Sequence, residues 1–277
     1  MSARTTVPAP AAPVTETVTV TVTKPGTKSR GHTVLAPLFL SELRMFLRGK
    51  AGPVFGLGLP LALLIVFGNI PFYAEHRRSL DGSTLLDVYV PILTAFVLAS
   101  LAFNVVPVVL VGYREKGVLR RLRTTPVGPA RVLAAQLLVN LATAAVSVAA
   151  VLLVARLAFG VALPRQIGGY LAALALSALA LMTIGLFIAA VAPDSKVADA
   201  LGTTLFYVMM FFAGLFLPIA VMPSLLQHIS RAAPLGAAVQ ALTDATQGHW
   251  PHPIQLITLA AYAVVFGAGA VKCFRWQ

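Results

Sequence analysis

The densest group of side chains that could bind a partner lies in one short polar stretch between two long apolar runs. Residues 113–126 contain a single carboxylate, Glu115, among five basic side chains. Leu119 and Leu122 stand three apart, as on one face of a short amphipathic helix, and Pro126 would end that helix. A carboxylate set among cations suits docking on another protein. The alternative is that these positive charges only fix the orientation of a membrane helix.

Residues of the types used in catalysis and metal binding are scattered along the chain. None of the nine carboxylates lies well inside an apolar run, although Asp199 stands at the edge of one. Proton- and ion-driven transporters use intramembrane carboxylates as relays, so this pattern disfavours that class. His249 and His252 have a spacing that a metal could tolerate, but no carboxylate is near them in sequence, and an external loop is favoured. We predict no catalytic residue and no metal site.

Four side-chain amides interrupt the apolar runs, at Asn69, Asn104, Gln136 and Asn140. An amide in lipid needs a partner, and such an interaction is worth about 1 kcal/mol. Helix–helix packing is the first interpretation for all four. The alternative is a polar point on a substrate path, for which Asn104 and Asn140 are the candidates. The lone cysteine, Cys273, excludes an internal disulfide and a cysteine-built metal site.

The composition of the chain is strongly apolar, and it predicts the kind of helices that carry these residues. The chain has 277 residues, 58% hydrophobic and only 11% charged, whereas soluble domains carry about 25% charged residues. A helix that spans the membrane needs about 20 apolar residues. In apolar runs of this length, only a helix can satisfy the hydrogen bonds of the backbone within lipid. The sequence predicts an all-α membrane protein. Its six predicted transmembrane helices cover about 53–73, 88–112, 132–155, 168–192, 200–222 and 254–271.

The ends of the chain differ from this membrane region. Residues 1–33 are rich in Thr, Val, Pro and Ala and are predicted to be a disordered tail. Residues 34–50 place apolar and basic side chains on opposite faces, which predicts an interfacial amphipathic helix. Sixteen of the 21 lysines and arginines lie on the side that holds both termini, so both termini are predicted to be cytoplasmic. Because the positive charges lie between apolar runs, we expect them to set the orientation of the protein in the membrane and not to bind nucleic acid.

Two stretches resemble the ABC-2 type permease family, the membrane subunits of bacterial ABC exporters. The first combines the step from Glu115 to Gly117, the run Arg121–Pro126 and a span that opens at Val132. The second, Phe211–Pro223 followed by Pro234, is similar to the fifth helix and outer re-entrant helices of daunorubicin-resistance-type permeases. The resemblance covers residues 34–277, with 51–277 as the transmembrane domain.

The resemblance implies a coupling helix at 113–126 that docks into a cleft of a separate ATPase subunit. The residues expected to couple to the ATPase are Glu115, Gly117, Arg120, Arg121, Leu122 and Pro126. No G-x-x-x-x-G-K-[ST] loop occurs in the sequence, so this chain is not expected to hydrolyse ATP by that route. ATP and Mg would bind the partner, and no cofactor is expected in this chain.

The resemblance also implies an export function in the bacterial cytoplasmic membrane. A second permease copy, identical or closely related, would pair with this one in lipid. The substrate would be hydrophobic or amphipathic, such as a drug, an antibiotic or a lipid, as in multidrug efflux or antibiotic resistance. Short re-entrant helices would form within 223–253 on the outer side. Two other functions stay open: a membrane-embedded enzyme and a non-transport membrane assembly factor.

Overall fold

The computed structural model describes residue 44 and residues 53–71, 84–117, 129–217, 219 and 222–273, with side chains in the third range from residue 134 onward. The predicted tail 1–33 and, except for Arg44, the predicted interfacial helix 34–50 lie outside the described residues. The described part of the chain is helical and contains no strand. Its elements are η1 (Val54–Gly58), α3 (Leu59–Asn69), α5 (Leu85–Ser100), η3 (Leu101–Val105), α6 (Val106–Glu115), α8 (Pro129–Phe159), α9 (Ile167–Val191), α10 (Ser195–Phe212), α11 (Ser224–Ala232), α12 (Pro234–Gln247) and α13 (Pro253–Cys273).

Four helices in the described part are long and apolar enough to cross a membrane. They are Leu85–Glu115, Ala134–Phe159, Ile167–Val191 and Pro253–Cys273, and Val54–Asn69 is a shorter apolar helix. The prediction of an all-α membrane protein is thereby confirmed. The predicted spans 53–73 and 200–222 correspond to shorter helices of 16 and 18 residues. At 1.5 Å per residue these are about 24 and 27 Å long, against about 30 Å of hydrocarbon.

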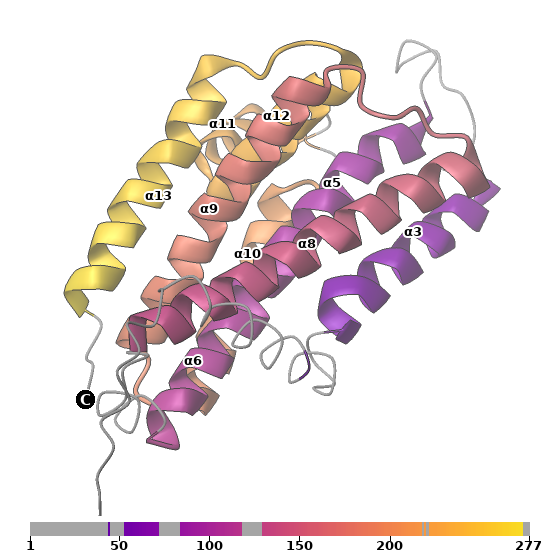
Figure 1. The fold of residues 1–277 in the computed structure, drawn as a ribbon. Helices are drawn as coiled ribbons and strands as arrows, with labels where there is room; N and C mark the ends of the chain where they lie inside the picture. Colours follow the sequence, from indigo (N-terminus) through magenta and orange to yellow (C-terminus); the bar gives the residue numbers. More distant parts are fainter. Residues whose placement is uncertain are drawn as a thin grey trace, which may run out of the picture.

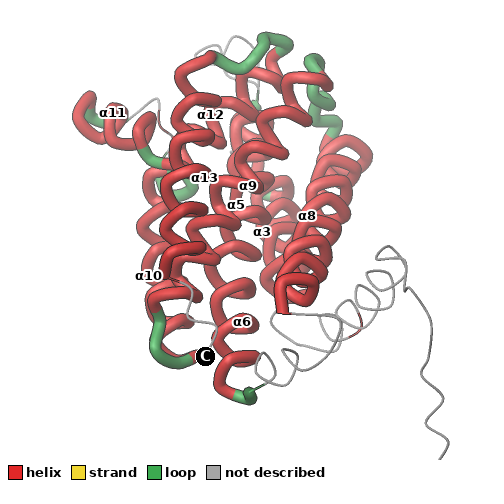
Figure 2. Tube along the Cα trace, turned by 60° about the vertical axis from the view of Figure 1, so that its left-hand side comes forward, coloured by secondary structure: helices red, strands yellow, loops and turns green. Residues whose placement is uncertain are grey.

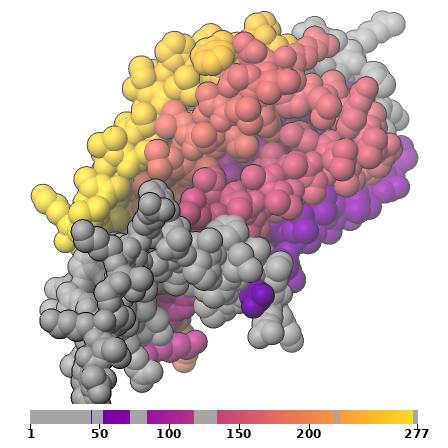
Figure 3. All heavy atoms as spheres, in the orientation of Figure 1, coloured from indigo at the N-terminus to yellow at the C-terminus, as the bar shows by residue number. Residues whose placement is uncertain are grey.

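The helices pack side by side as one bundle (Figure 1). Its centre is the continuous run of α5, η3 and α6, where every residue from Tyr89 to Val106 is buried except Asn104. In the space-filling view, α13 and α3 lie on opposite flanks with α8 and α9 between them (Figure 3). Exposed leucines and valines cover α8 and α13, among them Val146, Leu157 and Val264. Such a continuous apolar exterior suits lipid and not water.

The central helix contains a π-helical turn whose cause is Pro107. Proline has no N–H and its ring clashes with the carbonyl four residues earlier, so η3 widens just before it. Two neighbouring helices approach the widened turn through glycines. A Cβ on Gly185 of α9 would lie 2.1 Å from the Ala102 carbonyl oxygen, and one on Gly202 of α10 would lie 2.0 Å from that of Phe103. These glycines therefore set how closely α9 and α10 pack on the centre.

Helix α10 ends earlier than the sequence pattern predicts. The predicted span 200–222 is helical in its first part, but the helix stops at Phe212, where Gly214 takes a left-handed φ of +90°. The chain then turns into α11, which projects from the bundle (Figure 2). The Ser230 hydroxyl donates to the Phe212 carbonyl at 2.6 Å, and a Cβ on Gly236 would lie 2.0 Å from the Ser230 carbonyl oxygen. This contact fixes the corner between α11 and α12 on the end of α10.

Candidate functional site: a helix junction and an adjoining hollow

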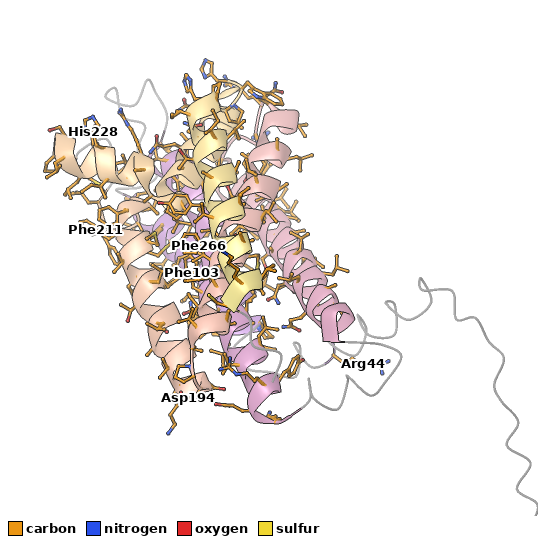
Figure 4. All side chains as sticks on the ribbon, turned by 90° about the vertical axis from the view of Figure 1, so that its left-hand side faces the viewer. Arg44, Phe103, Asp194, Phe211, His228 and Phe266 are labelled. Carbon is orange, nitrogen blue, oxygen red and sulfur yellow. The ribbon has the colours of Figure 1, made fainter. Side chains whose placement is uncertain are left out.

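Helices α6, α9 and α10 meet at one end of the bundle, where the predicted coupling segment begins. Asp194, at the start of α10, and Arg44 lie at this end, and His228 of α11 lies at the other (Figure 4). The carboxylate of Glu115, the last residue of α6, accepts two hydrogen bonds from Ser195. The Ser195 N–H donates to Oε1 at 2.8 Å and its hydroxyl donates to Oε2 at 2.5 Å. Glu115 thus binds the first residue of α10.

The preceding residue, Arg114, binds the other side of the same turn. Its guanidinium donates to the carbonyls of Ala189, Ala192 and Pro193, the last at 2.9 Å. The C-terminus of a helix carries partial negative charge and the N-terminus partial positive charge. A cation at the end of α9 and a carboxylate at the start of α10 both complement these dipoles. Two consecutive side chains of α6 therefore hold the α9–α10 turn from both sides.

A residue of the turn itself also caps the start of α10. The Asp194 side chain accepts a hydrogen bond from the Val197 N–H at 2.8 Å, which begins α10. Gly117 has a φ of +64° and ends the described segment after α6. This is the left-handed conformation that glycine adopts at helix ends, which gives a structural reason for the Glu115-x-Gly117 step. The predicted coupling residues Arg120, Arg121, Leu122 and Pro126 lie outside the described residues.

A hollow of about 220 Å³ opens beside the centre of the bundle, between α3, α5–α6 and α10. Asn104, the one residue between Tyr89 and Val106 that is not buried, lines it, as do Asp199 and Thr203 of α10. The Thr203 hydroxyl donates to Asn104 Oδ1 at 3.3 Å. The rest of the lining is apolar and largely aromatic: Phe55, Leu59, Phe96, Val108, Phe206, Tyr207, Met210, Leu215 and Phe216.

Asp199, predicted at the edge of a span, is the third polar residue of this hollow. It lies in the second turn of α10, which begins at Ser195. Asp199 and Thr203, four residues apart, fall on one helix face. Within the described residues no hydrogen bond or ion pair reaches the exposed Asp199 carboxylate. The signal that could have located it is the N-cap pair Asp194–Ser195, which marks the true helix start.

The second substrate-path candidate, Asn140, is not part of the hollow. It is fully buried in α8, where its Nδ2 donates to the Gln136 carbonyl at 2.9 Å. Its Oδ1 atom has no hydrogen-bond partner in the described part of the chain. Asn69 also bonds within its own helix, to the Ile65 carbonyl at 2.8 Å. The structure thus places Asn104 at a cavity and Asn140 in a packed helix interior.

The two histidines considered for a metal lie in the loop between α12 and α13. The His249 N–H donates to the Asp244 carbonyl at 2.9 Å, and the His252 N–H donates to Gln255 Oε1 at 3.0 Å. Gln255 in turn donates to Asp244 Oδ2 at 2.8 Å. These contacts close the loop between the two helices. Among the described residues, no three His, Cys, Asp or Glu side chains are grouped as metal ligands.

Comparison with known proteins identifies the family. The family model described as ABC-2 type transporter matches residues 36–246. That range is more than half of the 277-residue chain, and it takes in the α6–α9–α10 junction and the whole lining of the hollow. No curated protein matches the chain. The resemblance of the Glu115–Pro126 segment is thereby confirmed at the level of the family. The chain belongs to the ABC-2 type transporter family, the membrane permeases of ABC transporters.

Proposed function

We propose that the chain is the permease subunit of an ATP-driven exporter, which moves a hydrophobic or amphipathic substrate out across the bacterial cytoplasmic membrane. The observation that carries this proposal is the family match over residues 36–246. The proposed architecture has six spans with both termini in the cytoplasm, a tail at 1–33, an interfacial helix at 34–50, and α11 and α12 as outer re-entrant helices. The partners are a separate ATPase, which holds ATP and Mg, and a second permease copy.

The α6–α9–α10 junction supplies a physical route from the ATPase to the substrate path. In this proposal residues 113–126 are the coupling helix, and Arg120, Arg121, Leu122 and Pro126 contact the ATPase. Glu115 and Arg114 begin that segment and bind Ser195 and the end of α9. A displacement of the segment would therefore pull on α9 and α10 together. The two states must differ in their contacts for ATP binding to favour one of them.

The hollow beside Asn104 is the proposed site of substrate contact. Its aromatic lining suits an apolar body, and Asn104, Thr203 and Asp199 offer a few polar groups to orient it, the usual composition of a small-molecule site. Helix α10 contributes both to this hollow and to the Glu115 contact, so one helix connects coupling and binding. Asn140 is proposed to act in packing and not in substrate contact.

The proposal is tested by co-purification with an ATPase. The permease is co-expressed with the ABC ATPase encoded beside it, and the complex is isolated through a tag on the permease. Arg121→Glu, combined with Arg120→Glu, reverses the charge of the proposed docking segment and is expected to abolish recovery of the ATPase. Arg156→Glu, which reverses one charge at the opposite end of α8, is the control. Equal recovery of the ATPase with the wild-type permease, the double variant and the Arg156→Glu control would contradict the docking assignment.

A further inference from the structure

A basic hollow of about 750 Å³, distinct from the Asn104 hollow, lies where the ends of α6, α9 and α13 meet. It is lined by Arg114, by residues 190–193 at the end of α9, and by Lys272 and Cys273 at the end of α13. Within the described residues no hydrogen bond or ion pair reaches the exposed Lys272 side chain. The hollow therefore brings two cations from distant parts of the sequence to one place.

The carboxylates at this end of the bundle lie outside the hollow, although the charge of Glu115 interacts with that of Arg114. Glu115 accepts both of its hydrogen bonds from Ser195, and Asp194 caps α10 through the Val197 N–H. Neither carboxylate lines the hollow. The described lining consequently carries positive charge and no side-chain negative charge.

An apolar groove of about 630 Å³ lies between α10 and α13 and adjoins the basic hollow at one residue. Its walls are α10 and α13, and α9 forms its floor. Phe103 of the central helix and Phe266 of α13 both line it. Val191 lines the groove and the basic hollow alike. The two spaces are thus neighbours that meet at Val191, with basic side chains in one and apolar side chains along the other.

The length of the groove matches one leaflet of a bilayer. On α10 it runs from Val197 to Met209, which at 1.5 Å per residue is about 18 Å. Half of the roughly 30 Å hydrocarbon core is about 15 Å. The groove ends at Pro234, the first residue of α12. An acyl chain that entered beside Val191 would fill it without protruding beyond its own leaflet.

We propose that this composite site binds one anionic phospholipid, with the phosphate between Arg114 and Lys272 and an acyl chain in the α10–α13 groove. Charge complementarity favours an anionic headgroup, because basic pockets between membrane helices bind such lipids. The bound chain fills the space that separates α10 from α13, which packs on α9 and α12. The lipid thereby links α13 to the α6–α9–α10 junction. This site is separate from the Asn104 hollow and does not depend on the identity of an ATPase.

The headgroup contact is tested by native mass spectrometry of the full chain in detergent, titrated with phosphatidylglycerol or phosphatidylcholine. The wild-type protein is expected to bind the first phosphatidylglycerol more tightly than the first phosphatidylcholine. Lys272→Gln should weaken the phosphatidylglycerol complex about fivefold, the equivalent of about 1 kcal/mol for one basic residue at an anionic lipid. Lys196→Gln removes a cation at the same end that does not line the hollow and should leave the affinity unchanged.

The acyl-chain contact is tested by filling the groove. Leu201→Trp places a large ring where the chain would lie, and Val146→Trp places the same ring on the exposed face of α8 as a control. Phosphatidylglycerol should raise the unfolding temperature of the wild-type protein and of Val146→Trp, because a ligand that binds the native state stabilises it. It should not raise that of Leu201→Trp.

Three outcomes would overturn the assignment. These are equal affinity of the wild-type protein for both lipids, equal loss of affinity in Lys272→Gln and Lys196→Gln, and an unchanged effect of phosphatidylglycerol on Leu201→Trp. Because Lys272 and Leu201 are exposed, neither substitution disturbs the core, and both variants should fold. The measurements use the permease alone, so a failure of ATPase co-purification leaves their result intact.

Discussion

At the scale of single residues, the most informative contact is that between Glu115 and Ser195. The sequence analysis assigned Glu115 to docking on a partner, and the structure gives its carboxylate an intramolecular partner in α10. The two roles are compatible, since a residue at the root of a docking segment can transmit displacement without touching the ATPase. Its contribution should then appear in coupling and not in assembly.

This assignment leads to a prediction for Ser195. Ser195→Ala removes the hydroxyl donor at 2.5 Å from Glu115 but keeps the N–H donor. We expect ATPase recovery to be unchanged and substrate-stimulated ATP hydrolysis by the complex to fall several-fold, because α10 is held less firmly to α6. Ser195→Thr keeps the hydroxyl and should retain stimulation. Loss of ATPase recovery in Ser195→Ala would show that the contact serves assembly instead.

The two asparagines singled out from the sequence should respond differently to the same substitution. Asn104→Leu removes a polar group from the hollow and is expected to reduce substrate-stimulated ATP hydrolysis while the unfolding temperature stays close to that of the wild type. Asn140→Leu replaces a buried side chain whose Oδ1 has no described partner. The substitution removes this orphaned acceptor, whose burial costs free energy, together with one hydrogen bond within α8, so the unfolding temperature should stay equal to or above that of the wild type. Reversed phenotypes would contradict both assignments.

At the scale of elements, the π-helical turn before Pro107 determines how the bundle is packed. The turn widens the central helix where α9 and α10 cross it, and Gly185 and Gly202 admit the carbonyls of Ala102 and Phe103. The same turn carries Asn104, the single residue between Tyr89 and Val106 that is not buried. The π-helical turn therefore contributes Asn104 to the proposed substrate hollow.

Because the helices pack closely at this crossing, we expect one added methyl group to lower the free energy of unfolding. A Cβ on Gly202 would lie 2.0 Å from the Phe103 carbonyl oxygen, so Gly202→Ala must displace α10. Overpacking of this kind typically costs about 1–3 kcal/mol, and the unfolding temperature should fall. Gly267→Ala in α13 is the matched control, because its Cβ would meet the nearest atom at an ordinary 3.5 Å. An equal unfolding temperature for the two variants would refute the role given to Gly202.

At the scale of the whole molecule, the proposed orientation rests on the lysines and arginines of the sequence, 16 of 21 of which lie on the side predicted to hold both termini. Arg114 and Lys272 share a hollow at one end, while the loop after α12 lies at the other with α11 (Figure 4). By the positive-inside rule, the orientation that we propose places the first end in the cytoplasm. This orientation underlies both the proposed coupling and the proposed export.

Orientation is tested by cysteine labelling in intact cells after Cys273→Ser, which removes the single native thiol. His249→Cys, exposed in the loop between α12 and α13, should react with an impermeant maleimide from outside. Lys116→Cys, exposed at the end of α6, should react only after the membrane is permeabilised. The opposite pattern would place the proposed docking segment outside the cell, where it could not meet an ATPase.

The sequence by itself determined that this protein is helical, lies in a membrane and belongs to the ABC-2 family. Apolar runs of about 20 residues leave the backbone no other way to satisfy its hydrogen bonds in lipid, and the Glu115–Pro126 and Phe211–Pro223 stretches together carried the family resemblance. The ends of helices were harder to predict from the sequence. The apolar run, for example, continues through the turn at Gly214 that ends α10. Local signals such as Asp194 indicate where a helix starts, but they do not show which residues of other helices it will contact.

Only the tertiary structure decided which of these residues meet. Glu115 and Ser195 are 80 residues apart, Asn104 and Thr203 are 99 apart, and Arg114 and Lys272 are farther still. Each pair lies on helices whose relative rotation depends on the π-helical turn and on glycines that permit close crossing. Hydropathy is an average over a window and carries no information on that rotation. The polar contacts of the site therefore followed from packing and could not be predicted from the pattern.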